Sequence, residues 1–183
     1  MKTTIEQVSI NRLAGEECPK DLDNLILNAG ALLDNMGINI NGEQYWEPWT
    51  DKSYLSESDL QNRDIMSNVK AIDELFGYIK FVAETDGGEF IGYWCGPENN
   101  QICDAPLVYY DTEGQFELCG SRFVEALFFL VYDDDLLEQL RCICKTVGIP
   151  LEFESIDDIS IPKMNLTPNE LHEIKYDEYL RNA

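Results

Sequence analysis

The stretch FVAETDGGEFIGYW at 81–94 contains a glycine-rich turn between two apolar runs. This segment limits the possible folds of the chain more than any other. Residues 78–85 and 89–94 are rich in β-branched and aromatic side chains, which favour strands. The Asp-Gly-Gly at 86–88 suits a tight hairpin, because such turns need positive φ. A phosphate-binding glycine loop would instead lead from a strand into a helix N-terminus. A strand follows here, so the sequence predicts an antiparallel hairpin.

Short strands continue after this hairpin. Pro106 opens a third strand over 107–110, and a turn at 111–114 leads into a fourth over 115–119. Ser121 then suits the N-cap of an almost wholly apolar helix, which must be buried against the sheet. This succession predicts a meander of four strands followed by a buried helix.

Apolar residues at spacings of three and four predict the other helices. We expect these helices at 21–36, at 59–76, at 136–147 and after an N-cap at Thr167. Asn41-Gly42 favours a hairpin between 38–40 and 44–46, and 151–153 is a further candidate strand. No repeat or linker is visible, so we predict one α+β domain over 1–183 with a mainly antiparallel sheet flanked by helices.

The chain is strongly acidic, with 35 Asp and Glu against 13 Lys and Arg in 183 residues and a formal net charge of -22. Such a surface repels nucleic acid and anionic membranes, because phosphate groups are bound by lysine and arginine. It attracts cations and basic proteins instead. The acidity is also compatible with a role in solubility alone.

The cysteines and the N-terminal segment indicate the compartment. No leader of basic, apolar and small residues opens the chain, and its apolar stretches are far shorter than the ~20 residues that span a bilayer. We therefore expect a cytosolic protein with reduced cysteines. There is no Cys-x-x-Cys pair, and we interpret the six cysteines as small buried hydrophobic residues. They are Cys18, Cys95, Cys103, Cys119, Cys142 and Cys144.

Residue types that carry out catalysis are scarce. The single histidine is His172, and Tyr176 stands where a metalloprotease helix would have its second histidine. We interpret His172 as a surface residue. Asp111 and Glu113 flank the second turn and could act as an acid–base pair, but turn formation explains both carboxylates equally well.

Two groups of residues are the candidates for binding a partner protein. Trp46 and Trp49 bracket a Glu-Pro in a predicted loop, where exposed aromatic side chains would favour protein contact, although anchoring in the core is equally compatible with the pattern. Asp133, Asp134 and Asp135 form the second group. They could hold a cation, but carboxylates are also favoured at a helix N-terminus by the helix dipole.

The segment 77–131 resembles the SMI1/KNR4 family, also called the SUKH superfamily. The features that carry the resemblance follow one another in order. They are Phe81, Asp86-Gly87-Gly88, Gly92-Tyr93-Trp94, Pro106-Leu107-Val108-Tyr109-Tyr110, Asp111-Thr112-Glu113-Gly114 and Ser121-Arg122-Phe123-Val124-Glu125-Ala126-Leu127. The resemblance implies an α+β fold with a strongly curved sheet. Bacterial members are similar to immunity proteins that neutralise polymorphic toxins, many of them nucleases, and fungal members to regulators of cell-wall synthesis. None of this implies catalysis.

Together these features favour a non-catalytic, immunity-type protein that neutralises a basic toxin domain by direct contact, without cofactor or metal. One alternative is a carboxylate- and metal-dependent hydrolase using Asp111, Glu113 and the run of three aspartates. Another is a regulatory scaffold protein with a different partner.

Overall fold

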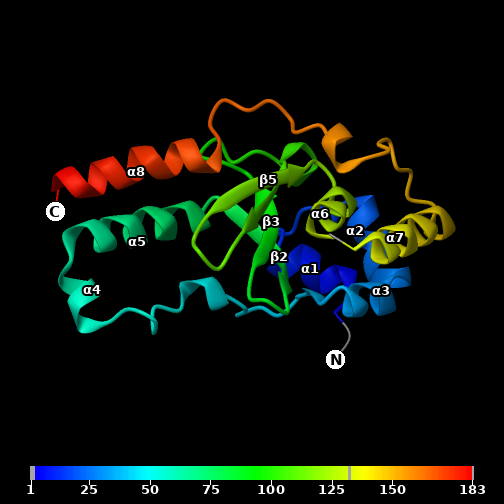
Figure 1. Ribbon diagram of the computed structural model, residues 1–183, viewed down its shortest axis with the longest axis horizontal. Coiled ribbons are helices and arrows are strands. Elements are labelled where there is room, and N and C mark those ends of the chain that lie inside the picture. Colours follow the sequence, from blue (N-terminus) through cyan, green and yellow to red (C-terminus); the bar gives the residue numbers. More distant parts are fainter. Residues whose placement is uncertain (1–2, 132, 183) are drawn as a thin grey trace.

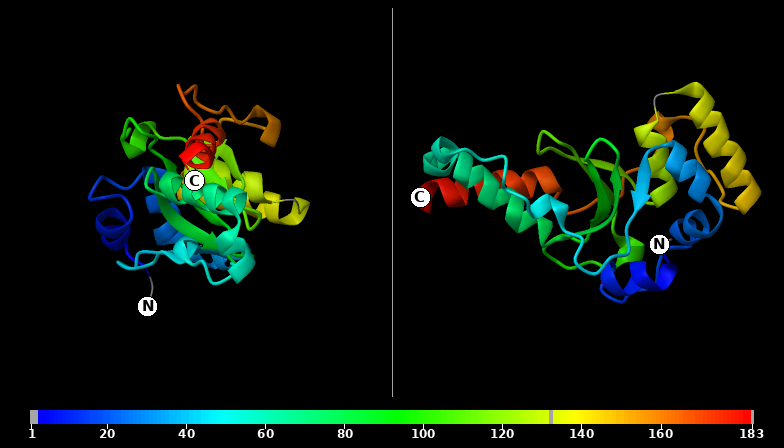
Figure 2. Two further views of the ribbon diagram at one scale, coloured as in Figure 1. Left: turned by 90° about the vertical axis from the view of Figure 1, so that its left-hand side faces the viewer. Right: turned by 90° about the horizontal axis from the view of Figure 1, so that it is seen from below.

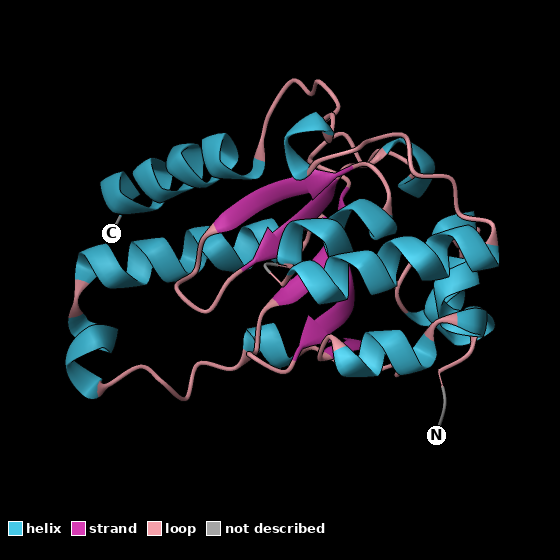
Figure 3. Cartoon of the chain, turned by 45° about the vertical axis from the view of Figure 1, so that its right-hand side comes forward, coloured by secondary structure: helices cyan, strands magenta, loops and turns pink. Residues whose placement is uncertain are grey.

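A five-stranded antiparallel sheet with the strand order β1-β2-β3-β4-β5 lies in the middle of the molecule (Figure 1). The computed structural model describes residues 3–131 and 133–182. The strands are β1 (Ile38–Ile40), β2 (Ile79–Thr85), β3 (Phe90–Trp94), β4 (Leu107–Tyr110) and β5 (Phe116–Gly120). The sheet twists and is open at β1 and β5 (Figure 3). The predicted α+β class and the antiparallel sheet are confirmed.

Helices cover both faces of this sheet. Those in the described residues are α1 (Ile5–Asn11), α2 (Lys20–Asn28), α3 (Gly30–Asn35), α4 (Glu57–Gln61), α5 (Arg63–Phe76), α6 (Phe123–Leu130), α7 (Asp134–Val147) and α8 (Pro168–Asn182). α5 and α8 run side by side on one side of the sheet, and α1, α2, α3, α6 and α7 lie on the other (Figures 1 and 2). Within the described ranges, no helix is both long and apolar enough to cross a bilayer.

The alternation of side chains along the strands explains why both faces are buried. In β3, Phe90 and Trp94 join the apolar cluster beneath α5 and α8. Ile91 and Tyr93, between them in sequence, join the larger cluster beneath α2 and α6. A sheet with helices on both faces needs apolar residues in both registers, and β3 is buried along its whole length.

The hairpin predicted around the Asp-Gly-Gly at 86–88 is confirmed. Thr85 N–H donates to Glu89 O at 2.9 Å, and Gly88 N–H donates to Thr85 O at 3.0 Å. Gly88 has a φ of +90°, a conformation that side chains with a Cβ rarely adopt. The turn therefore uses its glycine for backbone geometry, as expected.

Two predicted helices are each divided in the structure. The helix expected at 21–36 breaks at Ala29, where ψ is 16°, and Gly30, a poor helix former, begins α3. The helix expected at 59–76 breaks at Asn62, whose side chain accepts hydrogen bonds from the first turn of α5. At Asn62 these side-chain hydrogen bonds compete successfully with a continuous helix. At Ala29, whose methyl side chain cannot cap α3, the break lies in the backbone conformation before the glycine.

The predicted hairpin between 38–40 and 44–46 is wrong. β1 pairs with β2 instead, with Ile38 opposite Thr85. The carbonyl groups of Gln44 and Trp46 accept hydrogen bonds from the Arg12 guanidinium at 3.0 and 2.6 Å. Because Arg12 satisfies these two carbonyl groups, they need no neighbouring strand as a partner, and residues 44–46 lie outside the sheet.

Two further expectations near α6 need correction. Residues 151–153 do not form a strand, and Phe153 is buried by packing against Phe128 with ring centroids 4.9 Å apart. Ser121 is not the N-cap of α6, because Arg122 occupies that position. The predicted start of α8 is confirmed by reciprocal hydrogen bonds between Thr167 and Glu170.

Candidate protein-binding surface

The segment 43–62, here named the acidic arm, runs along one edge of the molecule from the sheet to α4 (Figure 1). It contains one short 3-10 helix, η1 (Pro48–Thr50), and then α4. One residue of the arm is basic, Lys52, and five are acidic. The acidic residues are Glu43, Glu47, Asp51, Glu57 and Asp59.

The two predicted tryptophans fix the base of the arm to the sheet. Trp46 is 9% exposed and packs against Phe90 with ring centroids 6.0 Å apart. Trp49 is partly exposed and lies 4.5 Å from Phe81, and the two tryptophan rings are 5.1 Å apart. The structure therefore places Trp46 as a buried anchor and leaves part of Trp49 on the surface. Contact of either with a partner stays a prediction.

Arg12 holds the same region from beneath. Its guanidinium lies 5.6 Å from the Trp46 ring and is 8% exposed. Burial lowers the pKa of Arg12, while the charge of Glu47 acts to raise it. Because the Arg12 guanidinium binds two backbone carbonyls of the arm, it fixes the backbone conformation of the first residues of the arm.

The outer side of the arm exposes apolar and aromatic side chains. Tyr45 is 87% exposed, Tyr54 68% and Leu60 55%. Tyr45 was missed in the sequence, because it lies in a turn before Trp46, where no helix or strand period indicates which way a side chain points. Tyrosine is enriched at protein-contact surfaces, so the exposed tyrosines favour such a role for the arm.

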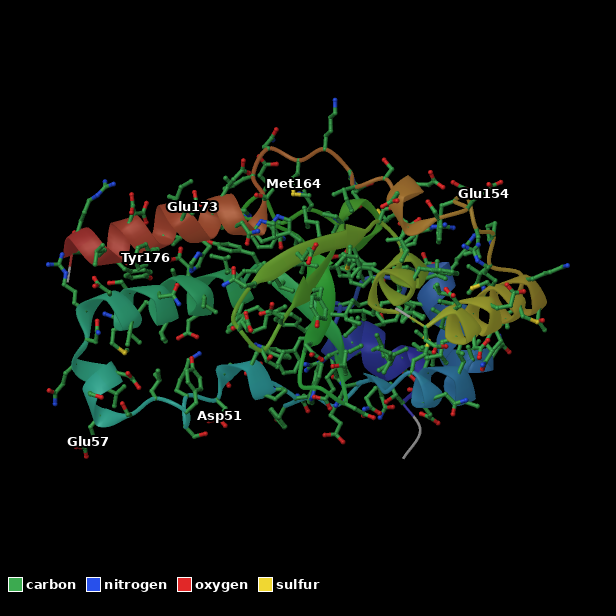
Figure 4. All side chains as sticks on the ribbon, in the orientation of Figure 1. Asp51, Glu57, Glu154, Met164, Glu173 and Tyr176 are labelled. Carbon is green, nitrogen blue, oxygen red and sulfur yellow. The ribbon has the colours of Figure 1, made fainter. Side chains whose placement is uncertain are left out.

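Two aspartates of the arm have a lowered pKa. Hydrogen bonds from the backbone and hydroxyl of Ser53 lower the pKa of Asp51, and the hydroxyl and backbone of Ser56 lower that of Asp59. Both groups are therefore ionised at neutral pH. Figure 4 shows Asp51 and Glu57 on the outer side of the arm, away from α5.

The one cation of the arm points inward. Lys52 Nζ lies 2.5 Å from Asp73 Oδ1 on α5 and 5.6 Å from the centre of the Phe76 ring. Lys52 thus attaches the arm to α5 and leaves the outward-facing carboxylates without a basic neighbour from within the arm.

The run of three aspartates lies elsewhere. Asp133 is the N-cap of α7 and accepts a hydrogen bond from Leu136 N–H at 3.0 Å. Asp134 and Asp135 are exposed in the first turn. α7 packs against α2 on the far side of the sheet from α5 (Figure 2). The structure therefore does not bring the predicted aspartates together with Trp46 and Trp49.

Asp111, one carboxylate of the hydrolase alternative, has structural partners. Asp111 Oδ1 accepts hydrogen bonds from Glu113 N–H at 2.9 Å and Gln115 N–H at 2.8 Å, which closes the β4–β5 turn. This turn lies over α5, since the Cβ position of Gly114 is 3.5 Å from Ile72. Within 3–131 and 133–182, no group of three or more His, Cys, Asp or Glu residues is arranged to hold a metal ion.

The cysteines only partly match their expected burial. Four of them are buried free thiols, but Cys103 and Cys142 are exposed. Cys103 lies in the polar connection between β3 and β4, and Cys142 on the solvent side of α7. Helical spacing places Cys144 on the inner face of α7 and therefore places Cys142, two residues earlier, on the outer face.

His172 is not a free surface residue as expected. Its Nε2 lies 2.9 Å from Asn68 Oδ1 on α5, and its ring stacks on Tyr176 with centroids 6.4 Å apart. Tyr176 is on the side of α8 that faces α5 (Figure 4). Burial lowers the pKa of His172, and the nearby charge of Glu173 raises it less.

We expect His172 to make the α5–α8 contact sensitive to acid. Its folded-state pKa is below the unfolded value of about 6.5, so its contribution to stability is complete above that pH and falls as the pH drops. The loss should be at most about 1 kcal/mol, because the ring is only half-buried. Urea denaturation between pH 7.5 and 5 measures it. His172→Gln should flatten this pH dependence, and an unchanged pH dependence in the variant would contradict the assignment.

Comparison of the chain with protein-family models, with curated proteins and with solved structures found no match.

Proposed function

We propose that this protein is a non-catalytic, immunity-type binding protein, similar to bacterial members of the SMI1/KNR4 family, that neutralises a basic toxin domain in the cytosol by direct contact. The observation that carries the proposal is the acidic arm. It combines exposed tyrosines with outward carboxylates on a segment whose base is anchored to the sheet.

Charge and exposed aromatic area both support this function. A toxin that acts on nucleic acid needs a basic surface for its substrate, and a chain of net charge -22 attracts such a surface over long distances. This attraction raises the association rate. Tyr45 and Tyr54 then supply rigid, amphipathic contact area, of the kind that contributes most to affinity when it is covered by a partner.

The experiment starts from the genes that flank the gene of this protein. We would co-express the chain with any flanking product that carries a basic C-terminal domain, and measure growth of the host and co-elution of the two proteins. Restored growth with a stable complex is expected. Failure to bind and to protect against every such product would refute the proposal.

Charge reversal distinguishes the acidic arm from the aspartate run. Glu43→Lys with Glu57→Lys should slow association with the toxin domain by ~10-fold or more at ~0.1 M salt, with a smaller effect at ~1 M salt. The matched control, Asp134→Lys with Asp135→Lys, changes the net charge equally at the other end of the molecule. It should leave the rate within ~2-fold, because exposed charges beyond the ~10 Å Debye length are screened. The opposite ranking would move the interface to α7.

A further inference from the structure

A groove with a volume of 570 Å³ lies on the α2–α6 side of the sheet, away from α5 and α8. Segments that are distant in sequence meet there, including the start of α2, the loop before β4 and the residues that follow α7. The exposed lining is mainly apolar, and its walls include Pro19, Ile102 and Ile149. A concave site of this size with apolar walls and few polar groups is typical of ligand-binding pockets.

Tyr93 contributes an unusual group to the groove. Its side chain is 1% exposed, yet its hydroxyl has no hydrogen-bond partner among the described residues. Burial, together with the charges of Asp21 and its neighbours, raises the pKa of Tyr93 well above the usual value. The hydroxyl therefore keeps its proton at any physiological pH and offers both a donor and an acceptor. Native proteins rarely leave such a buried group without a partner.

Arg122 contributes a second unpartnered group. Its Nε donates to Glu125 Oε1 at 2.9 Å, and its Nη1 donates to Pro150 O at 2.7 Å. These two bonds hold the guanidinium in place. The remaining Nη2 is buried and has no partner in the described part of the chain. Arg122 lines the groove, and its Nη2 is a fixed donor that is free to accept a new hydrogen-bond partner.

Asp21 adds an acidic group to the same lining. Its Oδ2 accepts a hydrogen bond from Val124 N–H in α6 at 3.0 Å, which fixes the carboxyl group at the groove. The lining also includes Glu17 and Lys20. With Arg122, the lining carries two acidic and two basic side chains, and the charge of Arg122 is already paired with Glu125, so no cluster of basic groups is present in this lining to favour an anion.

We propose that this groove binds a neutral amide that is attached to an apolar group, as in a short peptide segment. The amide carbonyl accepts hydrogen bonds from the Tyr93 hydroxyl and Arg122 Nη2, and the amide N–H donates to Asp21. The apolar group packs against Pro19 and Ile149. Such a ligand satisfies both unpartnered groups at once, and it does so independently of any partner of the acidic arm.

Three probes with the same apolar body test the preference for a neutral amide. They are N-acetyl-leucinamide, which is neutral, N-acetyl-leucine, which is an anion, and leucinamide, which is a cation. Each is titrated into the ¹⁵N-labelled protein at millimolar concentrations, and backbone amide shifts are followed. We expect the neutral probe to shift signals around the groove and to bind at least ~5-fold more tightly than either charged probe.

Tyr93→Phe tests the role of the hydroxyl. The variant keeps the aromatic ring and removes a buried group without a partner, so the fold should be retained. Binding of N-acetyl-leucinamide should weaken ~5-fold or more. Tyr54→Phe, on the acidic arm, should bind this probe like the wild type.

Three outcomes would overturn the proposal: no shifts at the groove with the neutral probe, equal or tighter binding of a charged probe, or unchanged affinity in Tyr93→Phe. The probe series on the unmodified chain decides between acceptance and rejection even if the variant does not fold. The acidic arm and the groove lie on opposite sides of the sheet. A negative result with the amide probes therefore does not affect the test of toxin binding by the arm, and a negative result with the toxin does not affect the test of the groove.

Discussion

Glu125→Ala is expected to destabilise the fold by about 2–3 kcal/mol, because it leaves two backbone N–H groups without their acceptor and the partly buried Arg122 without its counter-ion. Glu125 is 7% exposed. Its Oε2 accepts hydrogen bonds from the backbone N–H groups of Ser121 and Arg122 at 2.8 and 3.2 Å, and its Oε1 pairs with Arg122 Nε at 2.9 Å. One carboxylate thus accepts these three hydrogen bonds in the connection between β5 and α6. Alanine would leave these three donors without their acceptor.

Urea denaturation followed by circular dichroism measures the loss, and a melting temperature lower by about 2–4 °C per kcal/mol should accompany it. Glu125→Gln is the matched control. It retains one acceptor oxygen and the size of the side chain, so its loss should fall between the wild type and the alanine variant. Equal stability of the wild type and Glu125→Ala would show that the carboxylate does not hold this connection.

The acid dependence of stability gives a second readout for Glu125. Burial acts to raise its pKa, but the Ser121 N–H and the Arg122 side chain together lower it below the usual 4.5. A carboxyl group with a lowered folded-state pKa stabilises the protein above its unfolded pKa, and this contribution is lost as the pH falls through the folded value. The Gln variant should therefore lose less stability than the wild type below about pH 4.5.

Gly92→Val is expected to cost about 3 kcal/mol, because β2 passes too close to β3 for any side chain at this position. A Cβ at Gly92 would lie 2.8 Å from Lys80 O and 2.9 Å from Phe81 Cα. These are backbone atoms of the paired strand, so no rotamer change can relieve the clash. The pairing is irregular at this point, with a register shift between Phe81 and Ala83. The two strands would have to separate in the centre of the sheet.

Thermal and urea unfolding of Gly92→Val test this expectation. Gly87→Ala in the β2–β3 turn is the control, since the atoms nearest to its added Cβ belong to the flexible end of Glu89. We expect the control to lose less than about 1 kcal/mol. If both variants were equally stable, the close approach of β2 to Gly92 would not limit the side chain there.

Local signals were sufficient for most strands and helix ends. The Asp-Gly-Gly turn at 86–88, the strand at 107–110 and the start of α8 at Thr167 were all predicted correctly. Each depends on interactions within a few residues, such as positive φ at a glycine or a hydroxyl that caps the next turn. The almost wholly apolar segment 123–131 likewise indicated a buried helix, and α6 is buried as expected.

The candidate surface was only partly visible in the sequence. Trp46 and Trp49 pointed to the segment that forms the candidate surface, but the outward tyrosines of the acidic arm depend on which of two neighbouring side chains faces the sheet. The burial of Trp46 under Arg12, 34 residues earlier in the chain, decides this. No local pattern contains that contact.

Three properties of the protein follow from the order of its residues: the apolar runs that form strands buried on both faces, the glycine that turns its central hairpin, and the net negative charge. Three others exist only in the folded chain. They are the pairing of β1 with β2, the separation of the aspartate run from the tryptophans, and the meeting of Tyr93 and Arg122 at one groove. The difference comes from the range of the interactions. Backbone conformation and periodicity act over a few residues, whereas pairing, burial and the convergence of polar groups depend on contacts between segments that are distant in sequence.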